Sequence, residues 1–278
     1  MKQFRIWVVL LLSLIIFGCT TKFLYRNVDW IVMSYLDDYV SLTHEQERLA
    51  ENSIKRLSQW HRDNELPVYV AHIDELMQKT MAEVTPSWVQ SQAERLRSYS
   101  RRIGHKSGPQ LYALLMQLNE RQVNQLLENV AEKHQEFAHK FANTEESEIR
   151  ELYQERMEKA LNKWLGSLTN EQHALMIEWS LAVEITAQDR IEQNQKMLLE
   201  FQTLFAKRDD PSYFQSTLSR LLNQPESFYT ESLKQKMARN RPLTYRFIAQ
   251  LAAQVTDKQY QHLQKELVYW RQIGIDLQ

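Results

Sequence analysis

Apolar residues recur at every third or fourth position along most of this chain, which is the spacing of one face of an α-helix. The pattern predicts a first helical segment within residues 23–40 and a second from about His44 to Asp63. The longest helix is expected from Asn170 to about Phe205, because no Gly or Pro interrupts that stretch.

Helix-breaking residues are scarce, with only 5 Gly and 6 Pro among 278 residues. The sequence therefore predicts an all-α fold, an elongated multi-helix bundle of about eleven helices. The prolines are placed near helix starts, and Gly104, Gly108, Gly166 and Gly274 at helix ends or links. The stretch HKSGP (residues 105–109) is the best internal boundary, yet residues 23–278 are expected to form a single domain.

One short motif recurs along the chain: LTHEQ at residues 42–46, LTNEQ at 168–172, and the looser LNERQ at 118–122 and VTDKQ at 255–259. A Thr or Asn followed three residues later by Gln forms a capping box, in which each side chain bonds the other residue's backbone N–H. The spacing of the copies is too uneven for a solenoid repeat. We expect each copy to begin an amphipathic helix.

The N-terminal residues have the composition of an export signal. Lys2 and Arg5 precede a mostly apolar run from Ile6 to Phe17, which is shorter than the about 20 residues needed to span a membrane. The run ends at Gly18, directly before Cys19, the only cysteine of the chain. Residues 1–18 are therefore predicted to be a signal peptide.

The stretch IFGC (residues 16–19) resembles the lipobox of bacterial lipoproteins, although Phe17 replaces the usual small residue. The resemblance implies acylation of Cys19 and removal of the preceding peptide, followed by a short tether over residues 19–22. Thr20, where an Asp would favour retention, implies sorting to the outer membrane, facing the periplasm. The alternatives are an uncleaved anchor or a secretory signal with an incidental Cys. Acylation would remove a loose thiol from an oxidising compartment, and several acyl chains give stable membrane anchoring.

A broader resemblance rests on Trp30, YLDDYVSL (residues 35–42), Gln46, WHR (residues 60–62) and ELPVY (residues 65–69). These residues resemble an uncharacterised family of bacterial lipoproteins, known as a domain of unknown function. The resemblance covers most of the mature chain. It implies a lipid-anchored envelope protein and no activity.

The repeated Leu-Thr-x-x-Gln also resembles the motif of the Spy-type periplasmic chaperones, small helical cradles that hold unfolded clients. This resemblance covers about a tenth of the chain, and those chaperones are soluble and roughly half as long. The motif is also a good capping box in its own right. Both interpretations remain open from the sequence.

Composition and motifs favour binding over catalysis. The net charge of -1 argues against nucleic-acid binding, which usually needs a basic surplus. Asp37 and Asp38 are adjacent, so on a helix their carboxylates diverge. Glu136 and His139 form only half of a helical carboxylate metal motif. We expect no enzyme activity, metal or cofactor, with a hydrolase or metal enzyme as the less favoured alternative.

A basic segment, RLRSYSRRIGHK (residues 95–106), contains no acidic residue and offers candidate contacts to a partner or to anionic lipid. The alternative is a helix C-terminus that complements its own dipole. The sequence thus favours a lipid-anchored envelope protein that binds an envelope protein partner, with a chaperone for exported proteins as the alternative. The candidate contact residues are Arg95, Arg97, Arg101, Arg102 and Lys106.

Overall fold

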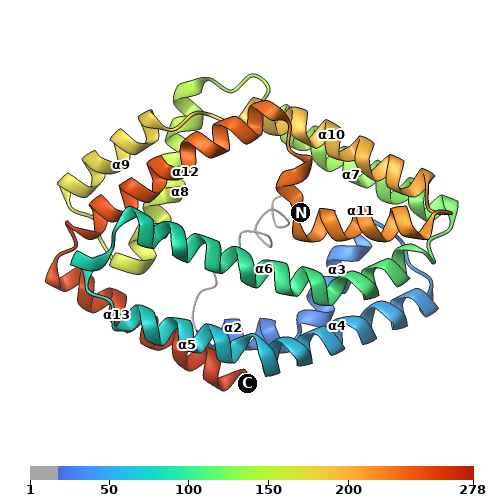
Figure 1. Cartoon of the computed structure of the whole chain (residues 1–278), viewed down its shortest axis with the longest axis horizontal. Helices are drawn as coiled ribbons and strands as arrows, with labels where there is room; N and C mark the ends of the chain where they lie inside the picture. Colours follow the sequence, from blue (N-terminus) through green and yellow to red (C-terminus); the bar gives the residue numbers. More distant parts are fainter. Residues whose placement is uncertain (1–17) are drawn as a thin grey trace.

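The computed structural model of the protein describes the chain from Gly18 to Gln278, with side chains from Thr21 onward. The described part holds α-helices and two short 3-10 helices and no β-strand, which confirms the all-α, multi-helix prediction (Figure 1). The helices are α2 (Gly18–Arg26), α3 (Val28–Asp37), α4 (His44–Asn64), α5 (Leu66–Met77), η2 (Met81–Glu83), α6 (Pro86–Leu115), α7 (Glu120–Phe141), α8 (Glu146–Leu165), α9 (Asn170–Ala182), α10 (Ala187–Ala206), α11 (Pro211–Asn223), η3 (Pro225–Phe228), α12 (Glu231–Ala252) and α13 (Asp257–Asp276).

The helices follow an elongated outline in the view of Figure 1. Helices α4 and α5 run along one long side with α13, while α7 and α10 run together along part of the other. Helix α6 lies between the two sides and packs against α4, α11 and α12. The starts of α4 and α7 meet at one end of the long axis, and the starts of α9 and α13 meet at the opposite end.

The four capping boxes are confirmed, and they meet in pairs. At the first pair, Thr43 caps α4 and Asn119 caps α7, each with the side chain of the Gln three residues on completing the box. The two glutamines, Gln46 and Gln122, also hydrogen-bond each other, with Nε2 to Oε1 distances of 3.1 and 2.6 Å. Both are buried, so their amides join two helix starts inside the protein. We call this contact the first glutamine joint.

The second glutamine joint repeats the same arrangement at the other end of the molecule. Gln172 at the start of α9 and Gln259 at the start of α13 bond each other at 2.9 and 2.7 Å. In both joints each Gln Nε2 also donates to the backbone carbonyl two residues before the partner's cap. The acceptors are the carbonyls of Ser41, Gln117, Ser167 and Gln254.

The placement of HKSGP at a boundary is wrong, because residues 105–109 lie inside α6. Pro109 is internal to α6, and Pro242 is internal to α12. Packing of α6 on three other helices compensates for the hydrogen bond that a proline removes. Gly104 allows α11 to approach α6 closely, since a Cβ there would lie 3.1 Å from the carbonyl oxygen of Leu222. Of the four glycines assigned to helix ends, Gly166 does end a helix, with a φ of 76°.

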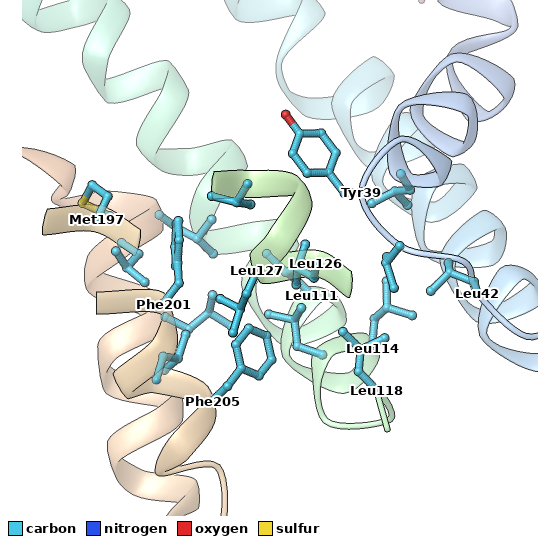
Figure 2. A pocket seen from close by; sticks show the side chains of 18 of the residues that line it. Tyr39, Leu42, Leu111, Leu114, Leu118, Leu126, Leu127, Met197, Phe201 and Phe205 are labelled. Carbon is cyan, nitrogen blue, oxygen red and sulfur yellow. The ribbon is translucent and has the colours of Figure 1, made fainter. Parts of the chain in front are cut away.

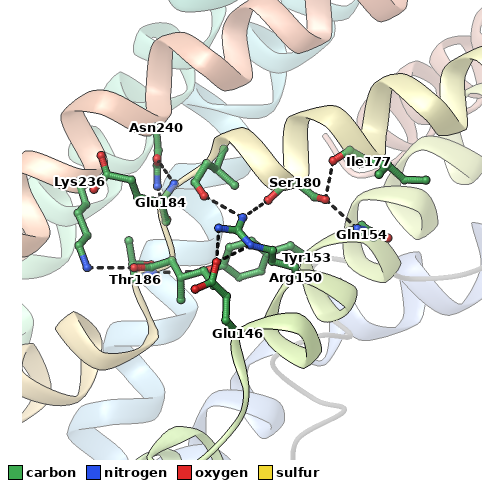
Figure 3. Close-up of polar contacts among 12 residues, drawn as sticks. Glu146, Arg150, Tyr153, Gln154, Ile177, Ser180, Glu184, Thr186, Lys236 and Asn240 are labelled. Atoms are coloured by element: carbon green, nitrogen blue, oxygen red, sulfur yellow. Dashed lines mark hydrogen bonds and ion pairs between the residues drawn. The ribbon is translucent and has the colours of Figure 1, made fainter.

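The expected long helix from Asn170 to Phe205 is wrong as well, because the chain leaves the helical conformation between α9 and α10. Side chains from other helices satisfy the backbone at this break (Figure 3). Arg150 of α8 donates to the carbonyl of Val183 at 3.1 Å. Asn240 of α12 accepts from the N–H of Glu184 at 2.8 Å and donates to its carbonyl at 2.7 Å. These partners are distant in the sequence, so the local sequence does not predict their contacts.

Candidate functional site

The structure contains a large apolar cavity of about 480 Å³ near the first glutamine joint (Figure 2). Side chains from α3, α6, α7, α10 and α11 and from the links between α3 and α4 and between α6 and α7 form its wall. They are Tyr35, Leu36, Tyr39, Val40, Leu42, Leu111, Leu114, Leu115, Leu118, Leu126, Leu127, Val130, Met197, Phe201, Leu204, Phe205, Leu218, Leu221 and Leu222.

The first glutamine joint fixes one part of this wall. Leu42 and Leu118 directly precede the caps of α4 and α7, and both line the cavity. Phe205 of the wall packs edge to face on Phe214 with ring centres 5.9 Å apart, and Phe214 is fully buried. The wall is therefore continuous with a packed core on one side.

The second joint adjoins a packed hydrophobic core. Leu168 and Val255 hold the positions that Leu42 and Leu118 hold in the first joint, and they pack against buried Met176 and Phe247. Trp179 stacks on Phe247 with ring centres 5.3 Å apart. The two joints have the same hydrogen-bond arrangement. The second adjoins a packed core, whereas the first adjoins the cavity.

Among the described residues that line the cavity, only Tyr35 and Tyr39 carry a polar side-chain atom. Tyr35 and Tyr39 lie one turn apart at the end of α3, and their hydroxyl oxygens are 3.1 Å apart. Burial raises the pKa of Tyr39, and the hydrogen bond with Tyr35 adds to the rise. Asn129 of α7 donates to the carbonyl of Tyr39 at 2.8 Å and so holds this end of the wall in place.

This cavity suits binding of an apolar group. Its volume falls within the range of about 300–1,000 Å³ that small-molecule sites have. Within the described part of the chain, no carboxylate, imidazole, amine or guanidinium lines it, so these residues offer no acid or base that titrates near neutral pH. Sequence reasoning missed the cavity. Its only sequence signals are the dense leucines between residues 111 and 127 and the tyrosines of YLDDYV.

A second cluster, of buried polar and aromatic side chains, lies between α4, α5 and α6. Glu65 is only 2% exposed and binds Arg102 through both oxygens, at 2.7 and 2.6 Å. Arg102 also covers the ring of Tyr99, whose hydroxyl lies 3.1 Å from Nδ1 of buried His72. Burial raises the pKa of Tyr69, which packs on Tyr99. The hydrogen bonds and ring contacts hold these groups against one another.

The predicted contact residues Arg95 and Arg102 bind acidic side chains of the protein itself. Arg95 pairs with Glu75 and donates to the hydroxyl of Tyr99 at 2.7 Å. Arg102 pairs with buried Glu65, as described above. Arg95 links α6 to α5, and Arg102 links α6 to the residue between α4 and α5, so both guanidinium groups have a structural role.

The other predicted contact residues are distributed along α6. Arg97 donates to the hydroxyl of Tyr245 at 3.2 Å, and the ammonium of Lys106 lies 5.6 Å from the ring centre of Trp60. Arg101 is exposed. Contact of this segment with a partner or with lipid stays a prediction, and Arg101 is the residue most open to it.

The two candidate pairs considered for catalysis or metal binding, Asp37 with Asp38 and Glu136 with His139, do not form a shared site. Asp37 ends α3, and Asp38 is the C-cap of that helix. Glu136 binds Lys133 at 3.1 Å on the surface of α7. Within residues 18–278 we find no group of three or more His, Cys, Asp or Glu side chains placed to hold a metal ion.

The predicted signal peptide lies outside the described residues except for Gly18, where α2 begins. The residues expected to form a tether, 19–22, lie in α2, and the backbone of Cys19 is in its first turn. Helix α2 is fixed to the rest of the protein, since Lys22 pairs with Asp276 and the hydroxyl of Tyr25 lies 2.7 Å from Nδ1 of His61. In the described part of the chain, no helix has the length and apolar character needed to cross a membrane.

Comparison with known proteins gives a family and no activity. The sequence model of a family of unknown function, DUF6279, matches residues 38–234. The matched range includes α6, α7, α10 and α11, which form most of the cavity wall. The expected membership of a family of unknown function is thereby confirmed, while lipidation and the Spy-type resemblance stay predictions. No curated protein matches the chain, and no solved structure matches it.

Proposed function

The chain belongs to DUF6279, a family of unknown function, and we propose that this member is a lipid-anchored envelope protein that works by binding rather than by catalysis. Its anchor is Cys19, and it faces the periplasm from the outer membrane. The observation that carries the binding role is the apolar cavity of about 480 Å³.

Support for the anchor comes from the sequence. A charged start, a short apolar run and Gly18 precede the only cysteine of the chain. The acyl chains on Cys19 would hold the protein stably at the membrane, because several chains give much firmer anchoring than one. The protein then needs no membrane-spanning helix.

Support for the binding role comes from the cavity wall. A preformed apolar cavity provides burial for an apolar group without first having to open in a packed core. Because none of the described residues that line it is charged, an uncharged apolar ligand would bury no charged side chain of this wall. Two hydroxyl groups give it one polar end.

Mass analysis of the N-terminal peptide from the full chain, expressed in a bacterium, tests the anchor. The proposal predicts a peptide that begins at Cys19 and carries acyl chains on both the sulfur and the α-amino group. An unmodified Cys19 thiol, or a peptide that still contains residues 1–18, would contradict it. The Cys19→Ser variant is the matched control, and its N-terminal peptide should carry no acyl chain.

A protein partner is the second candidate role, and it is favoured by an exposed apolar stripe on α9. Ile177 and Leu181 are one turn apart on this helix and are 45% and 62% exposed. A photoreactive amino acid at Ile177 in cells tests this role, with the neighbouring exposed position Glu178 as the control. One stoichiometric envelope protein captured from Ile177 alone supports an assembly role, and equal capture from both positions argues against it.

The chaperone alternative is tested by the same crosslinking. A holder of exported proteins predicts many captured clients rather than one. The glutamines of Leu-Thr-x-x-Gln are buried in the joints, so they are not available to hold a client directly. A broad set of clients would therefore have to contact other surfaces, such as the exposed stripe on α9.

A further inference from the structure

We propose that the cavity holds a single long acyl chain, with the hydrocarbon tail between α6, α7 and α10 and the polar head beside the hydroxyls of Tyr35 and Tyr39. This inference rests on the proposed binding role and names the ligand class. The acyl chain can come from two sources: a lipid of the surrounding membrane or the protein's own acylated Cys19.

The chemistry of the wall selects hydrocarbon over peptide. Apart from the two tyrosine hydroxyls, the described side chains that line the cavity are aliphatic, aromatic or thioether groups. The segments that form the wall are mainly helices, whose backbone groups bond within the helix. A peptide segment inside would bury N–H and C=O groups without partners, which is costly. An acyl tail carries no such groups.

The wall also has the polarity expected for an amphiphile with one head. Tyr35 is 46% exposed, and Tyr39 is partly buried, so the hydroxyl pair lies between the apolar interior and solvent. A hydroxyl both donates and accepts, so the pair can bond a carboxyl or ester head. In Figure 2, Tyr39 lies to one side of the leucines and phenylalanines that surround the tail space.

The position of α2 and α3 brings this end of the cavity toward lipid. The two helices run from Gly18 to Asp37 with a break at Asn27, and Tyr35 is near the end of α3. Phe23 and Trp30 on these helices are 63% and 68% exposed. Exposed aromatic residues of this kind are typical of a membrane interface. An anchor at Cys19 would place both side chains, and the mouth of the cavity, close to the bilayer.

Photolabelling of the full chain in native membranes tests the inference. The probe is a C16 fatty acid with a diazirine near its methyl end. We expect labelled peptides from the tail space, namely residues 111–115, 126–130 and 197–201, with saturation at increasing probe. Labels confined to α2, α3 or the exposed stripe of α9 in both the unaltered protein and Cys19→Ser, or labels that rise linearly with probe, would overturn the proposal.

Filling the cavity provides a matched pair of variants. Leu127→Trp places a larger side chain in the tail space, whereas Leu96→Trp changes a leucine that is 57% exposed on α6 and does not line the cavity. We expect at least tenfold less labelling of the tail-space peptides in Leu127→Trp and no change in Leu96→Trp. Equal labelling in both would overturn the proposal. If Leu127→Trp does not fold, Leu111→Phe is the smaller filling variant, and the label positions in the unaltered protein decide the question alone.

The position of the polar head beside Tyr35 and Tyr39 has its own test. In the double variant Tyr35→Phe with Tyr39→Phe, the concentration of fatty-acid probe that gives half-saturation should rise about 2- to 10-fold, which is the effect of a lost hydrogen bond. The same concentration for an alkane diazirine, which has no polar head, should not change. Equal affinities for both probes in the unaltered protein would overturn the assigned orientation.

The source of the bound acyl chain follows from which protein is labelled. Labelling of the unaltered protein identifies membrane lipid as the source, and labelling only in Cys19→Ser identifies the protein's own acyl chain.

An aromatic diazirine without an acyl chain separates this inference from the proposed function. If the aromatic probe labels the tail-space peptides and the fatty-acid probe does not in either the unaltered protein or Cys19→Ser, the cavity binds apolar ligands other than acyl chains. The inference would then be wrong and the binding role would stand. If neither probe labels these peptides in either protein, both are wrong.

Discussion

The side-chain amides of Gln46 and Gln122 hydrogen-bond each other in both directions, although the two residues are 76 positions apart in the chain. Each amide also completes the capping box of its own helix. The pair Gln172 and Gln259 repeats this relationship at the opposite end of the molecule. The recurring motif therefore both begins a helix and joins that helix to a second one.

Replacing one glutamine of a joint should destabilise the protein. Gln46→Leu removes both hydrogen bonds between the side chains of Gln46 and Gln122 and takes the side-chain donor from the carbonyl of Gln117, which typically costs about 1–3 kcal/mol. Urea unfolding measures the change. Gln90→Leu is the control, because Gln90 is exposed and its side chain bonds exposed Glu94 on the same helix, and it should change stability by less than about 0.5 kcal/mol.

The joint also predicts coupling between its two members. In a double-mutant cycle, Gln46→Leu and Gln122→Leu should deviate from additivity by about 0.5–3 kcal/mol, because each single change already disrupts the shared contact. Gln46→Leu combined with Gln172→Leu, from the other joint, should be additive. Additivity in both cycles would mean that the two glutamines act only as separate helix caps.

Two arginines of α6 are expected to differ strongly in their effect on stability. Arg102→Ala leaves the carboxylate of Glu65, which is 2% exposed, without its cation, and breaking such a pair costs about 3 kcal/mol. Arg95→Ala breaks a pair with Glu75, whose side chain is 60% exposed, and should cost about 1 kcal/mol or less. Thermal unfolding of the two variants side by side measures the difference, and equal losses would contradict the structural role assigned to Arg102.

Local patterns in the sequence predict the helical class and the helix starts well. Capping boxes at Thr43, Asn119, Thr169 and Thr256 form from residues three positions apart, so the sequence contains all that they require. Their pairing through glutamine side chains depends on contacts between distant helices. The repeated Leu-Thr-x-x-Gln therefore predicts four helix starts and does not predict the joints.

The failed predictions share a physical cause, which is stabilisation by distant residues. Pro109 stays inside α6 because other helices pack around it. The break after α9 has no Gly or Pro, and Arg150 and Asn240 satisfy its backbone from other helices. The cavity exists where helix faces do not fully meet, and the spacing of leucines shows which face is apolar but not how closely two faces pack.

Two glycines of α6 should respond to alanine in opposite directions. A Cβ at Gly104 would lie 2.7 Å from Oδ1 of Asn223 and 3.1 Å from the carbonyl oxygen of Leu222, so Gly104→Ala should cost about 1–3 kcal/mol. At Gly108 the nearest atom is 3.6 Å away, and Gly108→Ala should stabilise the helix by about 0.5–1 kcal/mol. Urea unfolding measures both. A stabilising Gly104→Ala would contradict the close approach of α11 to α6.

His61 should make the protein less stable as the pH falls. Burial lowers the pKa of His61, with Arg62 adding to the fall and Glu65 opposing it. The unfolded chain therefore takes up a proton at a higher pH than the folded protein, and stability decreases as the pH drops below about 6.5. In His61→Gln, stability measured by urea unfolding should change less between pH 7 and pH 5.

His173 should affect the pH dependence of stability in the direction opposite to that of His61. Hydrogen bonding to Glu158 raises the pKa of His173, so its contribution is present at low pH and is lost as the pH rises through the folded pKa. His173→Gln should therefore make stability rise more steeply with pH, whereas His61→Gln makes the rise shallower. The same direction of change in both variants would contradict the assignment.

The central claim, that the cavity holds an acyl chain, is tested most directly by methyl NMR of the methionines with a fatty acid that carries a spin label near its methyl end. Met197 lines the cavity, whereas Met176 is 3% exposed in the packed core at the second joint. For the full chain in lipid nanodiscs, the claim predicts that the labelled chain broadens the methyl signal of Met197 and leaves that of Met176 sharp. The broadening should disappear in Leu127→Trp. A Met197 signal as sharp as that of Met176 at saturating fatty acid, both in the unaltered protein and in Cys19→Ser, would contradict the claim.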